Sequence, residues 1–325
     1  SNYQLPTLNA ANAPVTISAA TLTPTLTNTG VTKTYDGTTL TPSGFTPSYG
    51  VTGFVTGDTA ASLTATSVAY NNLNVASASY LRATGLAISS ITGSNNSAAS
   101  DYALSTSSVN GAAGSAVIHT KALNISGLST SNKVYDGSQT DSLTGTATLT
   151  GASTSSSDGK YVTGDTVSLT GSAVGTFADK NAGNSKTVTI SGLSLTGASA
   201  TNYNLNSLTS TANITQKTIS LSASKTYDGT TSLTGDVTIA TGVGSETLTY
   251  SGSTASDSHV ATASKYISAI TLADGSNGGL ASNYQLPTLN VANAPVTISA
   301  ATLTPTLTNT GVTKTYDGTT LTPSG

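Results

Sequence analysis

The stretch Lys33-Thr34-Tyr35-Asp36-Gly37-Thr38 is a short motif that returns at regular distances along this chain of 325 residues. Tyr-Asp-Gly occurs four times, each time with a lysine two residues before the tyrosine. The copies are Lys33, Tyr35, Asp36 and Gly37; Lys133, Tyr135, Asp136 and Gly137; Lys225, Tyr227, Asp228 and Gly229; and Lys314, Tyr316, Asp317 and Gly318. Successive tyrosines are 100, 92 and 89 residues apart. Spacings of this size match folding units of about 100 residues, so the motif predicts a tandem array of domains.

A longer repeat encloses this shorter one. Residues 282–325 repeat residues 1–44 with a single change, Val291 in place of Ala10. The offset of 281 residues is the sum of the three tyrosine spacings, so three diverged units form one larger repeat. We therefore expect the chain to be a window onto a longer periodic molecule. The predicted pieces are a fragment at 1–19, three units at 20–120, 121–216 and 217–300, and a second fragment at 301–325.

Two further markers recur inside the units. Four tyrosines follow an asparagine or aspartate shortly before the last strand of a unit: Tyr3, Tyr102, Tyr203 and Tyr284. Gly-Asp-Thr occurs at Gly57 and Gly164, and Gly244-Ser245-Glu246-Thr247 takes the corresponding position in the third unit. We interpret the tyrosines as inward-facing anchors and Gly-Asp-Thr as a hairpin turn.

Apolar and hydroxyl-bearing residues alternate with period two in many short segments. TVTIS at 187–191, TISLS at 218–222 and TVSLT at 166–170 are examples, and this alternation is typical of strands with one buried face. Glycine- and aspartate-rich turns separate the segments, and no window has the 3.6-residue apolar period of a helix. The pattern predicts an all-β protein of tandem Ig-like β-sandwich modules joined end to end as an extended rod, with β-grasp-like modules as the alternative.

Composition narrows the class of protein. Serine and threonine number 49 and 64, charged residues are 8% of the chain, and the net charge is −3. Neither nucleic acid nor an anionic membrane surface is therefore an expected partner, and no apolar run is long enough to insert into a membrane. Cysteine is absent, so stability must come from packing and hydrogen bonds. The lack of disulfides also fits export of an unfolded chain.

The Tyr-Asp-Gly motif is interpreted as a structural turn with an anchor. Glycine permits a positive φ, aspartate can accept a hydrogen bond from the backbone two residues on, and the tyrosine ring can cap a core. The competing hypothesis is that the lysine, tyrosine and aspartate of the motif form a catalytic site. An enzyme, however, does not need a copy of its active site in every repeat. A further hypothesis is an isopeptide bond between the recurrent lysines Lys33, Lys133 and Lys225 and the residues Asp101, Asn202 and Asn283.

Sites for enzymatic chemistry are not indicated. The chain has two histidines, His119 and His259, and no cysteine, which leaves too few ligands for a zinc site. No Gly-x-Ser-x-Gly elbow, phosphate-binding loop or EF-hand loop occurs. We therefore expect no enzyme activity, no cofactor and no metal.

Taken in order, Lys-x-Tyr-Asp-Gly-Thr, Gly-Asp-Thr and Asn-Tyr resemble the YDG-type repeat domains of very large Gram-negative surface proteins. Those proteins are similar to filamentous haemagglutinins and other adhesins, and many look like two-partner-secretion passengers. The resemblance covers essentially the whole chain. It implies an extracellular location on the bacterial cell surface and a stalk or adhesive role, and it supplies no ligand.

Two functions follow as expectations. The first is a structural repeat region of a surface fibre, stalk or filament, in which the partner is the protein itself, through neighbouring repeats or chains. The alternative is a multivalent adhesin module that binds host or matrix glycans weakly and gains strength from avidity. Tyrosines exposed at equivalent positions in every unit would favour the alternative.

Overall fold

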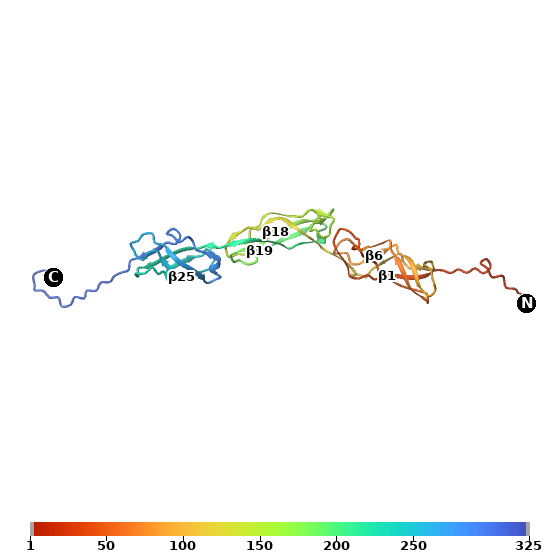
Figure 1. Cartoon of the computed structure of the whole chain (residues 1–325), viewed down its shortest axis with the longest axis horizontal. Helices are drawn as coiled ribbons and strands as arrows, with labels where there is room; N and C mark the ends of the chain where they lie inside the picture. The colour runs from red at the N-terminus through yellow and green to blue at the C-terminus, as the bar shows by residue number, and fades with distance from the viewer. Residues whose placement is uncertain (1–2, 323–325) are drawn as a thin grey trace. The chain divides into compact units, whose positions relative to one another are not determined.

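The computed structural model describes residues 3–322, and this part of the chain is built almost wholly from strands (Figure 1). Strands account for 45% of the residues and helices for 3%, so the expectation of an all-β protein is confirmed. Three 3-10 turns, Ala99–Asp101, Ala200–Asn202 and Ala281–Asn283, each end directly before a marker tyrosine. Within the described residues no helix has the length and apolar character needed to cross a membrane. Residues 1–2 and 323–325 of the predicted terminal fragments lie outside the described residues.

The chain divides into two compact units. The first comprises the chain up to Ser131 together with Asp141–Thr176 and Val188–Ser210, and the second comprises Asn132–Thr140, Phe177–Thr187 and the chain from Thr211 onward. This division falls inside the predicted repeat 121–216, so each compact unit holds one junction between successive repeats. The predicted repeat boundaries near residues 120, 216 and 300 remain a prediction.

Each predicted repeat contains two parallel strand pairs. The strand that opens the repeat pairs with the strand of the marker tyrosine: β1 (Ala20–Leu26) with β8 (Tyr102–Leu104), β11 (Lys121–Leu123) with β20 (Tyr203–Leu205), and β22 (Lys217–Thr218) with β27 (Tyr284–Gln285). The strand before Tyr-Asp-Gly pairs with the strand that closes the repeat: β2 (Val31–Thr34) with β10 (Ala116–His119), β13 (Lys133–Val134) with β21 (Leu208–Thr215), and β23 (Ser220–Thr226) with β28 (Val296–Ser299). Each predicted repeat therefore contains parallel as well as antiparallel strand pairs.

The remaining strands are mostly antiparallel. The antiparallel pairs are β1 with β3 (Tyr49–Thr52), β4 (Asp58–Thr64) with β7 (Ala87–Gly93), β5 (Ser67–Tyr70) with β6 (Leu81–Thr84), β6 with β9 (Ser108–Asn110), β12 (Ile125–Ser129) with β15 (Thr144–Leu149), β23 with β24 (Val237–Ala240), and β25 (Leu248–Ala255) with β26 (Ile267–Asp274). A five-stranded sheet has the order β13-β21-β19-β18-β14, with β14 at Thr140–Asp141, β18 at Ser168–Phe177 and β19 at Gly183–Thr196. The short strands β16 (Ala152–Ser153) and β17 (Tyr161–Val162) pair in parallel.

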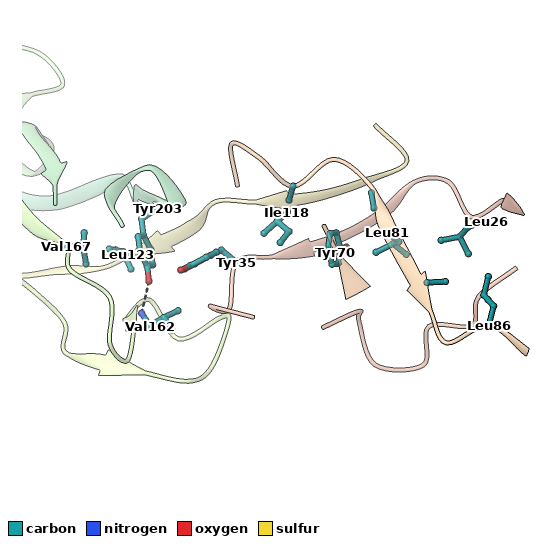
Figure 2. Packing of buried hydrophobic residues seen from close by; sticks show 13 residues of the cluster. Leu26, Tyr35, Tyr70, Leu81, Leu86, Ile118, Leu123, Val162, Val167 and Tyr203 are labelled. Atoms are coloured by element: carbon teal, nitrogen blue, oxygen red, sulfur yellow. Dashed lines mark hydrogen bonds between the residues drawn. The ribbon is translucent and has the colours of Figure 1, made fainter. Parts of the chain in front are cut away.

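Alternation in the sequence sets which side chains are buried. In β23, which reads SLSASKT, burial alternates at every residue, because successive side chains of a strand point to opposite faces. In the first unit the inward residues form one continuous core that runs from Leu26 and Tyr70 through Ile118 to Leu123 and Tyr203 (Figure 2). This core therefore contains residues of two successive repeats.

One sequence occurs in two structural states. Val296 lies in β28, paired with β23, and is 7% exposed, whereas Val15, its copy 281 residues earlier, lies outside any strand and is 84% exposed. Ile298 and Ile17 differ in the same way.

Candidate functional site: tyrosine clasps between repeats

The lysine of each Lys-x-Tyr-Asp-Gly motif is held within its own turn. Lys33 Nζ donates to Asp36 Oδ1 at 2.7 Å and to the Thr38 carbonyl at 2.8 Å, and the Thr38 backbone N–H donates to Asp36 Oδ1 at 2.9 Å. The lysine–aspartate contact recurs at 2.8, 2.7 and 2.8 Å in the other three copies, which are Lys133 with Asp136, Lys225 with Asp228, and Lys314 with Asp317. The turn is thus an Asx turn closed by a lysine that caps carbonyl oxygens.

This geometry does not fit the isopeptide hypothesis. Lys133 contacts Asp136, whereas the expected partner Asn202 bonds to the loop at Asn74 and Val75. An isopeptide bond needs the lysine nitrogen next to the side-chain carbonyl that it attacks. The structure therefore assigns the lysines to turn closure.

Tyr35 leaves its own repeat and contacts the next one. Its hydroxyl donates to Asp165 Oδ2 at 3.0 Å, and the hydroxyl of Tyr203 donates to the same oxygen. The two rings meet edge to face with centroids 5.3 Å apart, and the Val162 N–H donates to the Tyr203 hydroxyl at 2.8 Å. Figure 2 shows Tyr35 pointing toward Tyr203 and Val162. We call Tyr35, Asp165 and Tyr203 the first clasp.

Tyr135, Glu246 and Tyr284 form the second clasp, which lies in the second unit. Tyr135 donates to Glu246 Oε1 and Oε2 at 2.8 and 3.0 Å, and Tyr284 donates to Oε2 at 2.7 Å. The ring centroids are 5.4 Å apart, again edge to face. Lys180 Nζ lies 2.8 Å from Glu246 Oε1. Glu246 therefore accepts hydrogen bonds from two tyrosines, as Asp165 of Gly-Asp-Thr does in the first clasp.

An asparagine strengthens each clasp. Asn202, directly before Tyr203, accepts a hydrogen bond from the Val75 N–H at 2.9 Å and donates to Asn74 Oδ1 at 3.0 Å. The second junction repeats this contact: the Ala182 N–H donates to Asn283 Oδ1 at 2.8 Å, and Asn283 donates to Asn181 Oδ1 at 3.1 Å. Both motif asparagines are buried, so these bonds are made away from water.

Burial governs the charge state of the first clasp. Removal from water, followed by the hydrogen bond to Asp165, raises the pKa of Tyr35 to about 12. The same two causes raise the pKa of Tyr203. Both phenols therefore stay neutral and act as donors to one carboxylate.

Burial and hydrogen bonding also set the charge states in the second clasp, where Lys180 is an additional partner. Burial and the Glu246 carboxylate raise the pKa of Tyr135 and of Tyr284. Burial alone would raise the pKa of Glu246, but hydrogen bonds from Lys180, Tyr284 and Tyr135 outweigh it and lower that pKa. At neutral pH the site is a carboxylate held by two neutral phenols and an ammonium.

Alkaline pH is expected to weaken the first clasp. In the unfolded chain a tyrosine ionises near its ordinary pKa of about 10, whereas Tyr35 in the folded chain ionises near 12. The stabilisation is thus complete below pH 10, declines between the two values and is lost above the higher one. Urea unfolding at rising pH, followed by tyrosinate absorbance, measures this decline. Tyr35→Phe should show a smaller decline, and an equal decline in both proteins would contradict the assignment.

The sequence had not indicated where the motif residues would meet. The prediction that Gly-Asp-Thr is a hairpin turn is wrong at Gly164, because β17 before it pairs with β16 and β18 after it lies in a different sheet. The Asp165 N–H instead closes a tight turn by donating to the Val162 carbonyl at 3.1 Å. Its side chain, however, serves the neighbouring repeat. The available signal was that every unit keeps one acidic residue at this place: Asp58, Asp165 and Glu246.

The remaining motif tyrosines are placed as follows. Tyr102 is buried and donates to Asp58 at 2.7 Å within its own repeat. Tyr227, Tyr3 and Tyr316 are exposed. Gly229 and Gly318 have positive φ, like Gly37 and Gly137.

In each clasp one carboxylate accepts hydrogen bonds from two neutral phenols. All three groups lie at the contact between two successive repeats. Within residues 3–322, no group of three or more histidine, aspartate or glutamate side chains is arranged to hold a metal ion. Each clasp is a contact between residues of two successive repeats.

These features define an all-β repeat protein whose successive repeats are joined by tyrosine–carboxylate clasps. A YDG domain is detected at residues 119–213, which match the family model of that name. It includes Tyr135, Asp165 and Tyr203, one tyrosine from each kind of marker and one clasp carboxylate. No curated protein and no solved structure matches the chain.

Proposed function

We propose that this chain is a structural repeat region of an extracellular bacterial surface fibre, stalk or filament, without catalytic activity. The observation that supports this most is the use of the recurrent motif. Tyr35 and Tyr135, the most characteristic residues of their repeats, are each inserted into the following repeat and buried there. A fibre or stalk that resists pulling needs such contacts between its successive repeats.

Short joints also support a stiff array. β10 ends at His119 and β11 begins at Lys121; β21 ends at Thr215 and β22 begins at Lys217. Linkers of one residue leave little freedom for independent tumbling. We propose that the modules, Ig-like sandwiches or β-grasp-like modules, are joined end to end as an extended rod.

The proposed setting comes from the YDG resemblance. We place the chain in a filamentous-haemagglutinin-like adhesin of the two-partner-secretion type, on the bacterial cell surface. Its principal partner is then the protein itself, through neighbouring repeats or chains. The absence of cysteine fits passage of an unfolded chain through a narrow pore.

Weak glycan binding is the second candidate. A hollow of about 590 Å³ in the second unit is lined by apolar residues such as Val134 and Ile214 and by the amide side chains of Asn184, Gln216 and Gln285. Amide groups can bind sugar hydroxyls. The recurrent tyrosines Tyr35 and Tyr135 are buried and offer no aromatic platform, which favours the structural role. Specific retention on a glycan array, abolished by Gln216→Ala, would favour the glycan role instead.

Two measurements test the structural role. Immunogold labelling of intact source cells should decorate the surface, and label that appears only after permeabilisation would contradict it. Electron microscopy of single molecules should show a narrow distribution of bend angles at each joint. In the double variant Tyr35→Ala/Tyr135→Ala this distribution should broaden, because both clasps are open; an unchanged distribution would contradict a stiffening role for the clasps.

A further inference from the structure

Each clasp is made of two complementary halves from successive repeats. The donor half carries the tyrosine and glycine of Tyr-Asp-Gly and a loop asparagine, as in Tyr35, Gly37 and Asn74. The acceptor half carries a valine, a carboxylate, a marker tyrosine and the residue before it: Val162, Asp165, Tyr203 and Asn202. Gly37 is part of the fit, because a Cβ there would lie 2.7 Å from Val162 Cγ1.

The repeat 20–120 carries a complete acceptor half without a donor. Tyr102 donates to Asp58 Oδ2 at 2.7 Å, and the Val55 N–H donates to the Tyr102 hydroxyl at 3.1 Å, which is the network of Tyr203, Asp165 and Val162. The two valines differ in burial, however: Val162 is 8% exposed and Val55 is 52% exposed. A hollow of about 420 Å³ lies beside Val55, Asp101 and Tyr102.

The repeat 217–300 carries a donor half without an acceptor. Tyr227 is 39% exposed, whereas Tyr35 is 1% exposed. A Cβ on Gly229 would meet no atom of the described chain within 4 Å, in contrast to Gly37. The Asx turn itself is intact, with Lys225 bonded to Asp228 at 2.7 Å. The donor surface is thus formed and uncovered.

In the donor half of repeat 217–300, His259 stands where the donor half of repeat 20–120 has the loop asparagine Asn74. A backbone hydrogen bond identifies equivalent residues: the N–H groups of Tyr70, Phe177 and Ala255 donate to the carbonyls of Thr39, Gln139 and Thr231, each three residues after the motif aspartate. Four residues beyond these donors stand Asn74, Asn181 and His259. The first two pair with Asn202 and Asn283.

The acceptor half of repeat 20–120 differs at the matching position. Asp101 precedes its marker tyrosine, where the other repeats have asparagine. The two exceptional residues, His259 on the donor and Asp101 on the acceptor, are complementary, since an imidazole N–H can donate to a carboxylate. His259 Nδ1 already lies 2.9 Å from Asp257 Oδ1, and Asp101 Oδ2 accepts from the Ala98 N–H at 2.7 Å, so the new pair uses His259 Nε2 and Asp101 Oδ1. The asparagine–asparagine pair of the two observed clasps is thereby replaced by a histidine–aspartate pair.

We infer that the donor half of repeat 217–300 binds the acceptor half of a second copy of repeat 20–120, in a third clasp made by Tyr227, Asp58, Tyr102, His259 and Asp101. The order of the sequence agrees with this pairing, because residues 301–325 repeat residues 20–44 directly after the 217–300 repeat. The contact rests on the structural role proposed above and names its partner, a copy of the chain's own first repeat.

An extended chain tests the contact. A second copy of residues 45–120 is fused after Gly325, so that residues 301–325 and the added segment together reproduce repeat 20–120. Nitration of Tyr227 by tetranitromethane, quantified by mass spectrometry of its peptide, should slow by about tenfold or more relative to the original chain, since a buried ring reacts only through local opening. Nitration of Tyr250, in the same repeat, should keep its rate. Unchanged nitration of Tyr227 in the extended chain would overturn the inference.

Two variants of the extended chain sharpen the result. Val55→Arg in the added copy alters a residue that is exposed in the isolated repeat, so the copy should fold, yet the arginine should block the approach of Gly229 and restore nitration of Tyr227. Asp101→Asn in the added copy should weaken protection, and His259→Asn in the same molecule should recover it. Protection that persists with Val55→Arg would show that another surface covers Tyr227. Surface labelling of cells is independent of these outcomes, so failure of the contact and failure of the proposed function can be told apart.

Discussion

Tyr35→Ala is expected to lower the free energy of unfolding of the first unit by about 3–5 kcal/mol, the cost of truncating a fully buried aromatic residue. The change removes the ring that packs on Tyr203 and leaves Asp165 with one phenol donor fewer. Tyr227→Ala alters the same motif residue in the third repeat, but its ring is half-exposed. We expect a loss of about 1 kcal/mol there, the centre of the distribution for point mutants.

The comparison needs a measurement that separates the two units, because a chain of two units does not unfold in one two-state step. Hydrogen exchange at increasing urea, read by mass spectrometry, gives an unfolding curve for the peptides of each unit. Tyr135→Ala repeats the test in the second unit, and Tyr35→Phe separates the hydroxyl, worth about 1–2 kcal/mol, from the ring. If Tyr35→Ala and Tyr227→Ala lower the free energy of unfolding equally, the contacts of the clasp do not contribute to stability.

Gly37→Ala should cost about 2–5 kcal/mol, and Gly229→Ala about 1–2 kcal/mol. Both glycines have left-handed backbone, with φ of +77° and +84°, and an alanine in that region costs roughly 1–2 kcal/mol. At Gly37 the new methyl group would also lie 2.7 Å from Val162 Cγ1. Valine is stiff about χ1 and cannot easily move away, so overpacking of about 1–3 kcal/mol is added.

Gly137 offers a second copy of the crowded case, since its Cβ would lie 2.8 Å from Val243 Cγ1. The same exchange experiment measures all three variants, and Gly229→Ala is the matched control for backbone strain. In the extended chain, Gly229→Ala should become as costly as Gly37→Ala, because the valine of the added copy then faces it. Equal losses of unfolding free energy for Gly229→Ala and Gly37→Ala in the original chain would contradict this explanation. The motif glycine would then not be needed for the close approach to valine.

The features that were predictable from sequence are those made by neighbouring residues. The Asx turn uses atoms two to five residues apart, and it forms even at Lys314 and Asp317, where no strand surrounds it. Alternation in segments such as SLSASKT predicts strands because the two faces of a strand differ in burial. These interactions depend only on local chain geometry.

The clasps were not predictable in this way. Tyr35 and Asp165 are 130 residues apart, and each fits an ordinary local role, one as a core cap and the other as a turn residue. Only the pairing of strands across the junction brings them together. Glu246 was harder still to recognise, because its side chain is longer and its Gly-Ser-Glu-Thr context departs from Gly-Asp-Thr.

The sequence by itself determined the repeat period, the all-β class and the turn at each Tyr-Asp-Gly, because these arise from contacts within a few residues. Tertiary structure alone decided that the motif tyrosines Tyr35 and Tyr135 bind the next repeat. The physical reason is that a strand or an aromatic ring gains stability only when a partner surface removes it from water, and sequence does not say where that surface will be.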